Sequence, residues 1–148
     1  MVGPVVCVFP HSDDEFPSAD ALRNFLSNTL PKMQKGRYLL RRLGWKDKDF
    51  KARIIPESLV LFRKGAVIVG DAAVQEPIQK LEPPVHDRTE VGIPMIYYHD
   101  IVFHPESIRV YTKAQPIKTL ESWSGRRLYP SFYAILGTRL DYEKTFPR

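Results

Sequence analysis

Two tryptophans stand among clustered cations, where their rings could stack on a flat ligand. Trp45 lies between Arg41–Arg42 and Lys46–Lys48, and Trp123 shortly precedes Arg126–Arg127. Stacking of an unpaired nucleic-acid base on an aromatic ring stabilises a complex by about 1–3 kcal/mol, and nearby cations hold the phosphates. Neither tryptophan belongs to an alternating apolar pattern, which favours a role in a binding site. The alternative is that each tryptophan pins its loop onto the core.

A base held in a pocket also needs hydrogen-bonding partners along its edge. Ser58 and Asp71 have side chains that could supply them. Tyr97 offers a further ring, because side chains alternate along a strand and Tyr97 would share one face with His99. That face could line a pocket. The alternative is a half-buried strand whose amphipathic residues lie at its rim.

The basic residues are concentrated in one segment of the chain. Residues 32–64 contain eleven Lys and Arg and three acidic residues, a net charge of +8, in a chain whose net charge is +5. Such a segment attracts polyanions and favours contacts with phosphate groups. The cations that we expect to contact a nucleic-acid backbone are Arg41, Arg42, Lys46, Lys51, Arg53, Lys64, Arg126 and Arg127. A solvated face, or a face that docks an acidic protein, would carry the same charge.

Length and composition indicate one ordinary domain. The chain has 148 residues, of which 43% are hydrophobic and 26% are charged, close to globular averages. No apolar run is long enough to cross a bilayer, and the apolar stretch Val5–Phe9 lacks the features of a signal peptide. The single cysteine, Cys7, excludes an internal disulfide and is typical of a reducing compartment. We therefore expect a soluble, cytoplasmic protein.

The elements that must position these side chains begin with a strand and a helix. Val5–Phe9 is apolar and β-branched, which predicts a strand. Ser18 has the character of a helix N-cap, and the apolar residues after it repeat at helical spacing until Pro31 ends the segment. Residues 37–42 predict a strand or a short helix, and residues 43–53 predict a basic loop.

The rest of the chain is dominated by strand signals. Leu59–Phe62 and residues 67–74 predict a hairpin, and Gly70 within it predicts a bulge. Further strands are expected over Met95–Phe103 and Ser107–Tyr111, and a strand or short helix is expected over 132–136. Residues 76–92 predict a long loop, and residues 113–131 predict irregular structure. One strand, one helix and then mostly strands predict an α+β domain built around a strongly bent sheet or small barrel.

One part of this pattern resembles a known superfamily. Pro56–Phe62 followed by Gly65–Val74 resembles the central hairpin of PUA-like barrels, which include the EVE, ASCH and YTH domains. Ile101–Tyr111 is similar to a strand–turn–strand segment of EVE-like modules attached to modification-dependent restriction nucleases. The resemblance implies an EVE-like, strongly bent β-barrel with one or two flanking helices. It would span residues 1–148 as a single domain, which could be one module of a larger protein.

The resemblance also implies a reader of nucleic acid that holds one modified, flipped base in an aromatic pocket. We expect this pocket to contain Trp45, Trp123 and Tyr97, with Ser58 and Asp71 at the edge of the base. The expected partner is DNA rather than RNA, with a nuclease or an ATPase fused or bound as effector. The hypothesis needs no cofactor, no metal, no catalytic residue and no membrane.

A second resemblance offers a different class of function. Residues 10–15 are similar to the PHPDDE loop of zinc-dependent deacetylases of the N-acetylglucosamine type, which implies His11 and Asp14 as metal ligands and Asp13 as general base. The nominal third ligands are His86, His99 and His104. Ser12 replaces the proline of that family, and Phe16–Pro17–Ser18 replaces its glycine-rich segment. A zinc-dependent amidohydrolase and a protein-interaction domain therefore remain the alternatives to the reader.

Overall fold

Seven strands of the described residues form one mixed sheet around which the helices pack. The computed structural model describes residues 3–41, 49–131 and 133–148. The strands are β1 (Val5–His11), β2 (Arg37–Leu40), β3 (Leu59–Lys64), β4 (Val67–Arg88), β5 (Pro94–Phe103), β6 (Arg109–Pro116) and β7 (Ala134–Thr138). Their order in the sheet is β2-β5-β4-β3-β1-β7, and β6 pairs with the first part of β4. The helices are α1 (Ala19–Asn24), η1 (Phe25–Met33), α2 (Asp49–Arg53), η2 (Pro105–Ser107), α3 (Ile117–Ser124) and α4 (Arg139–Thr145).

The central strands β1 and β3 are buried on both faces, so the sheet separates two hydrophobic cores. They run parallel, with Cys7 opposite Val60 and Phe9 opposite Phe62. These four side chains belong to the core beneath α1 and η1. Their alternating neighbours, among them Val8, belong to the core covered by α3 and α4. Two-sided burial explains why the β1 sequence is a continuous apolar run rather than an alternating one.

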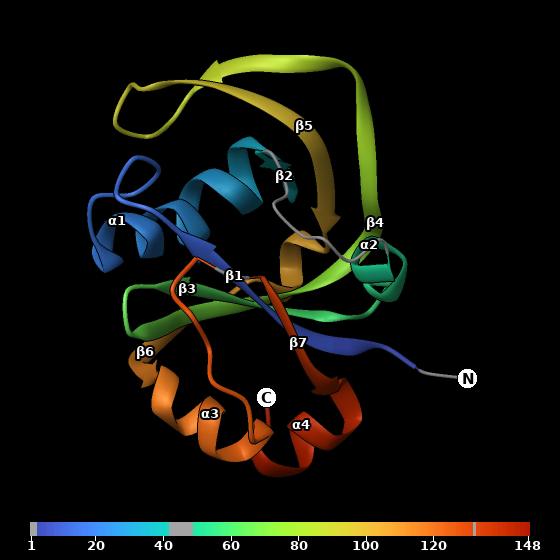
Figure 1. Ribbon diagram of the computed structural model, residues 1–148. Helices are drawn as coiled ribbons and strands as arrows, with labels where there is room; N and C mark the ends of the chain where they lie inside the picture. Colours follow the sequence, from blue (N-terminus) through green and yellow to red (C-terminus); the bar gives the residue numbers. More distant parts are fainter. Residues whose placement is uncertain (1–2, 42–48, 132) are drawn as a thin grey trace.

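The longest strand, β4, bends into an arch with β5. The two strands pair from Val74 and Phe103 to Arg88 and Pro94, and the arch passes over α1 and η1 (Figure 1). The prediction of a long loop over residues 76–92 is therefore wrong. Its prolines suggested a loop, yet Pro77 and the pair Pro83–Pro84 lie in the interruptions of the β4–β5 register. A proline there removes no ladder hydrogen bond, and the interruptions let the strand bend.

The start predicted for the first helix is confirmed, but its predicted end is not. The Ser18 hydroxyl accepts a hydrogen bond from the Ala21 backbone N–H at 3.1 Å, as an N-cap should. Pro31, predicted to end the helix, lies inside η1, which has π-helical geometry. An α-helix would drive the proline ring into the carbonyl four residues earlier, and the wider π turn avoids this clash.

The β3–β4 hairpin and its bulge are confirmed. The pairing shifts between Phe62 and Arg63, next to Gly70. A Cβ atom on Gly70 would lie 2.3 Å from the Arg109 carbonyl oxygen, so the approach of β6 to β4 requires glycine.

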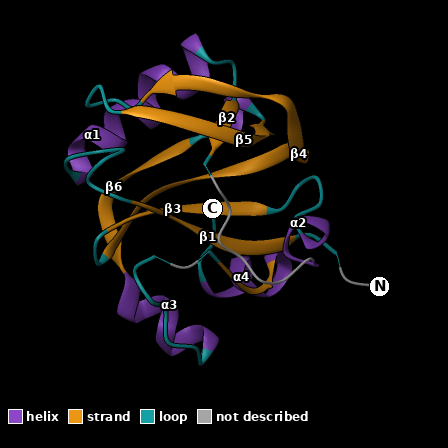
Figure 2. Ribbon diagram, turned by 45° about the horizontal axis from the view of Figure 1, so that its top comes forward, coloured by secondary structure: helices purple, strands orange, loops and turns teal. Residues whose placement is uncertain are grey.

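The α+β class is confirmed, but the sheet does not close into a barrel. Among the described residues β2 and β7 stand at the two ends of the strand order, β6 pairs with β4 alone, and no pairing joins β2 to β7. The segment 113–131, expected to be irregular, contains the end of β6 and helix α3. Helices α2 and α4 were also not expected, because each is shorter than the window over which helical periodicity shows. Figure 2 shows that α3 and α4 lie on the opposite side of the sheet from α1.

Candidate functional site

A pocket opens beneath the end of the β4–β5 arch. Of the residues that the structure describes, four buried aromatic rings line it, from Phe16 before α1, Phe25 in η1, Tyr38 in β2 and Tyr97 in β5. The other lining residues are Glu15, Gln34, Leu39, Asp87, Arg88, Thr89 and Glu90, and the cavity measures about 70 Å³. At about 30 Å³ per water molecule, this space suits a small flat group or the edge of a larger ring.

Tyr38 is fixed in the pocket wall by a buried histidine. His11, the last residue of β1, is 7% exposed, and its ring stacks on Phe62 with 5.8 Å between centroids. Its Nδ1 lies 3.0 Å from the Arg63 carbonyl oxygen, which can only accept, so Nδ1 carries the proton. Burial lowers the pKa of His11, which keeps the ring neutral. Nε2 therefore accepts a hydrogen bond from the Tyr38 hydroxyl at 2.5 Å.

Glu15 brings a negative charge to the aromatic wall. Its side chain is 18% exposed, and Oε1 accepts a hydrogen bond from the Ser12 backbone N–H at 3.2 Å. The Arg41 guanidinium lies 3.8 Å from the same oxygen. Burial, and after it the Glu15 carboxylate, raises the pKa of both Tyr38 and Tyr97. Glu15, Tyr38 and Tyr97 all line the pocket.

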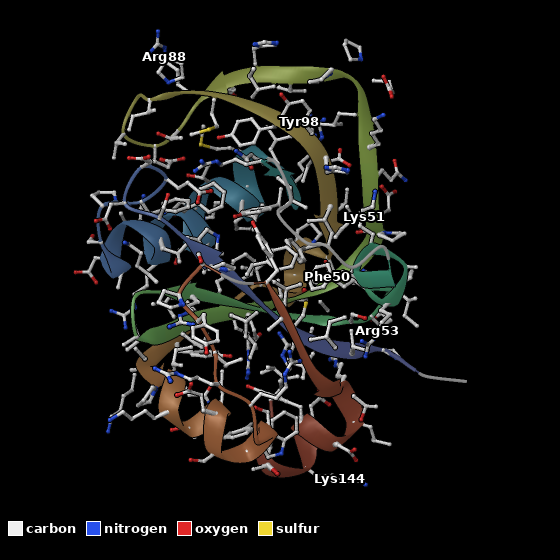
Figure 3. All side chains as sticks on the ribbon, viewed as in Figure 1. Phe50, Lys51, Arg53, Arg88, Tyr98 and Lys144 are labelled. Atoms are coloured by element: carbon white, nitrogen blue, oxygen red, sulfur yellow. The ribbon has the colours of Figure 1, made fainter. Side chains whose placement is uncertain are left out.

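The tip of the arch is a tight, internally bonded turn at the pocket rim. The Thr89 N–H donates to the Ile93 carbonyl at 2.9 Å, and the Arg88 guanidinium donates to the Gly92 carbonyl at 2.8 Å. Gly92 has a φ of 85°, in the left-handed region that favours glycine. Arg88 lies at this tip in Figure 3, far from Lys51 and Arg53 on α2.

A second, wider hollow of about 560 Å³ lies beside the pocket. Its lining includes Ile96 and Tyr98, which alternate with Tyr97 along β5 and are 39% and 37% exposed. Arg41 and Asp87 also contribute. The two sides of β5 therefore differ: one buries Tyr97 in the aromatic pocket, and the other exposes apolar side chains.

No protein-family model matches this sequence, and no match is found among curated proteins. None of the helices in the described part of the chain is long and apolar enough to cross a membrane.

The structure does not bring together those nominated pocket residues that it describes. Tyr97 lines the aromatic pocket. Trp123 packs edge-on against Tyr142 and Phe146 below the sheet, with centroid distances of 5.5 and 6.0 Å. Ser58 is fully buried, and its hydroxyl accepts a hydrogen bond from the Val5 N–H at 3.1 Å. Both side chains serve the packing of the sheet.

Asp71, the other nominated partner for a base, is fully buried in an ion network. Its carboxylate accepts hydrogen bonds from Arg148 at 2.7 Å, from Arg109 at 2.9 Å and from the Tyr111 hydroxyl at 2.6 Å. With these partners in place, its oxygens are not directed into a pocket. Trp45 lies outside the described residues.

The nominated cations are distributed over several parts of the molecule. Arg41 pairs with Glu15 beside the pocket, and Lys64 pairs with Asp13. Arg126 donates to the Ile135 carbonyl, and Arg127 lies over the Tyr129 ring at 5.3 Å. Lys51 and Arg53 project from α2 (Figure 3). Arg42 and Lys46 lie outside the described residues.

The acidic loop does not assemble the zinc site that the second resemblance implies. Both ring nitrogens of His11 are engaged, one by the Arg63 carbonyl and the other by Tyr38. Within the described residues, no group of three or more His, Cys, Asp and Glu side chains is arranged to hold a metal ion. His11 instead belongs to the core, and Asp14 is exposed.

Sequence reasoning missed most of the residues that line the pocket. Phe25 has the spacing of a core residue in a helix, Phe16 lies in the loop before that helix, and Tyr38 lies in a short strand of unremarkable pattern. Tyr97 was expected in the pocket, and Glu15 also carried a signal, as the last acid of the loop after β1. These residues meet because β5 pairs with β2 and arches over η1, an arrangement that no local pattern encodes.

Proposed function

We propose that this protein binds nucleic acid and holds one unpaired or flipped base in the aromatic pocket beneath the β4–β5 arch. The observation that carries the proposal is the pocket wall of Phe16, Phe25, Tyr38 and Tyr97. Aromatic rings stack on any base, and a pocket at the end of a bent sheet is suited to a base taken out of its stack. The cavity of about 70 Å³ would admit the edge of the base, with the sugar at the mouth.

The basic segment supports the choice of ligand. β2, which lies within residues 32–64, supplies Tyr38 and Leu39 to the pocket, and Arg41 follows directly after it. The segment with a net charge of +8 therefore passes the pocket. Arg88 adds a cation at the rim. Cations beside a stacking site are the arrangement expected for a ligand that carries phosphates.

We also propose that the fold is PUA-like, in an open rather than a closed form. The β3–β4 hairpin with its Gly70 bulge, the bent β4 and the helix after β1 support this assignment. On that basis, DNA with a modified base is the favoured ligand, and a nuclease or an ATPase is the favoured effector. A single domain over residues 1–148, and a cytoplasmic location, remain predictions of the sequence.

The test compares two neighbouring tyrosines on opposite faces of β5. Binding of a short fluorescent single-stranded DNA with one modified cytosine is measured by anisotropy, at low and at raised salt. Tyr97→Ala should weaken binding by about 5- to 150-fold, the equivalent of one lost stacking interaction. Tyr98→Ala is the matched control and should change the affinity by less than about threefold. The logarithm of the affinity should fall linearly with the logarithm of the salt concentration.

Two further arms make the result decisive. Tyr97→Leu keeps an apolar side chain in the wall, so a loss of binding in a protein with unchanged melting temperature reports the ring itself. The affinities for RNA and for unmodified DNA of the same sequence are measured in parallel and rank the ligands. The proposal fails if neither DNA nor RNA binds at low salt, or if Tyr98→Ala weakens binding more than Tyr97→Ala does.

A further inference from the structure

Among the described residues, the lining of the aromatic pocket has more acidic than basic side chains, although the chain as a whole is basic. Glu15, Asp87 and Glu90 belong to this lining, and Arg88 is the cation that the structure describes there. A carboxylate beside a ligand that carries phosphates is unfavourable unless it makes a contact that offsets the repulsion. Glu15 is positioned for such a contact, because it lines the pocket with a side chain that is only 18% exposed.

The Glu15 carboxylate is held in place with hydrogen-bonding capacity to spare. Oε1 is occupied by the Ser12 N–H at 3.2 Å and faces Arg41 at 3.8 Å. Within the described residues no hydrogen bond reaches Oε2, and the side chain is only 18% exposed. A carboxylate oxygen of this kind gains most from a ligand that brings an N–H donor.

The hydrogen bond of Tyr38 points to the same ligand chemistry. Since the Arg63 carbonyl holds the His11 proton on Nδ1, the Tyr38 hydroxyl must donate its own proton to Nε2. The hydroxyl oxygen that remains can only accept. Glu15 and Tyr38, which both line the pocket, therefore have acceptor capacity left and no free donor.

The bases of DNA and RNA differ in how well their hydrogen-bonding groups match these acceptors. Guanine presents an amino group beside a ring N–H, and cytosine and adenine each present an amino group. Thymine and uracil present a ring N–H between two carbonyl oxygens, which would face the carboxylate. A buried acceptor facing another acceptor costs the hydrogen bonds of both groups, and this cost is the basis of strong discrimination.

We propose that Glu15 makes the pocket selective for a base with an exocyclic amino group and against thymine and uracil. Guanine ranks first, because its two adjacent donors match the carboxylate. This selectivity rests on the proposed function, since it assumes that the pocket holds a base. Tyr38 acts with Glu15 as a second acceptor, and His11 is the positioning residue that fixes the direction of the Tyr38 hydroxyl.

The experiment offers the protein one base at a time. A short fluorescent single strand carries guanine, cytosine, adenine or thymine at one central position, and its flanking positions are abasic. The wild-type protein should bind the three amino-bearing strands at least about tenfold more tightly than the thymine strand. Glu15→Gln should reduce this difference to less than about threefold, because an amide can also donate to a carbonyl of thymine.

The control is an acid outside the pocket. Glu106→Gln, on η2 with a side chain 78% exposed, removes the same charge and should leave the base preference unchanged. Melting temperatures confirm that each variant is folded. If Glu15→Gln does not fold, the order in which the wild-type protein binds the four strands still tests the selectivity.

The outcomes separate the two proposals. If no strand binds, the proposed function is overturned and the selectivity with it. If all strands bind equally, or thymine binds best, the selectivity is overturned and base binding stands. If the preference survives in folded Glu15→Gln, the assignment to Glu15 is overturned.

Discussion

At the scale of the residue, His11 shows how burial changes the chemistry of a side chain. In the sequence it stands before three acids and resembles a metal ligand. In the structure its ring lies between Phe62 and Tyr38, and its two nitrogens join the Arg63 carbonyl to the Tyr38 hydroxyl. The same residue type therefore serves to orient a wall of the pocket.

The buried His11 predicts that stability falls on mild acidification. The pKa of the unfolded residue is about 6.5, and burial lowers the pKa in the folded state. Above pH 6.5 both states are neutral at this site, and the full stability is present. Below it the unfolded chain gains a proton that the folded chain does not, so the free energy of unfolding falls. The slope approaches about 1.4 kcal/mol per pH unit between about pH 6.5 and the lowered pKa.

Urea denaturation between about pH 7.5 and pH 5.5 measures this slope, in a range where most carboxylates stay ionised. His11→Gln, which has no titratable group, should be less stable at neutral pH but flatter across the range. Burial, and then Lys51 and Lys80, also lowers the pKa of His99, so a smaller slope should persist. An unchanged slope in His11→Gln would show that other groups cause the acid sensitivity.

At the scale of the element, α3 decides the role of a tryptophan that the sequence left open. Trp123 extends from α3 to Tyr142 and Phe146. Its ring also covers Gly137, where the Cβ atom of any larger residue would lie 3.3 Å from it. The ring thereby joins α3 to α4 and β7. Its contacts favour the alternative in which the tryptophan pins its segment onto the core.

Trp123→Ala should destabilise the fold without changing the choice of base. Loss of a half-buried ring that bridges three elements should cost about 2–3 kcal/mol of unfolding free energy. Ser122→Ala, its exposed neighbour, should change stability by less than about 0.5 kcal/mol. Urea denaturation and the anisotropy panel, run where both variants are folded, give the comparison. A weaker base preference with unchanged stability would show that Trp123 belongs to the binding site.

At the scale of the whole molecule, Asp71 ties distant parts of the chain to β4. It has no exposed surface and binds Arg109 and Tyr111 of β6 as well as Arg148. Arg148 also donates to the Ser107 carbonyl at 2.6 Å. The two arginines together offset the cost of burying the Asp71 charge. Because they depend on the same carboxylate, its loss leaves both cations without this partner.

Asp71→Asn should therefore be one of the most destabilising single substitutions, with a loss of about 3–5 kcal/mol. Arg148→Ala should cost less, because Arg109 and Tyr111 still satisfy the carboxylate. Asp141→Asn, with a side chain 65% exposed, is the control and should stay within about 0.5 kcal/mol. Urea denaturation ranks the three variants. A loss for Asp71→Asn no larger than that for Asp141→Asn would contradict the role of the network.

The sequence by itself determined the features that depend on neighbours along the chain. The strand β1, the Ser18 cap and the Gly70 bulge each left a signal in residues that are neighbours along the chain. The α+β class follows from the order of these signals. Local patterns could not show that Pro77 and Pro83–Pro84 lie in register interruptions, because that depends on how β5 pairs with β4.

Only the tertiary structure decided where the pocket lies. Its wall joins Glu15, Tyr38 and Tyr97, which are far apart in the sequence and meet because β2 pairs with β5 beneath the arch. Contacts elsewhere in the fold give Trp123, Ser58 and Asp71 structural roles. The physical reason is that side-chain chemistry acts over a few ångströms, whereas the pairing that sets those distances spans some sixty residues, from Arg37 to Val102.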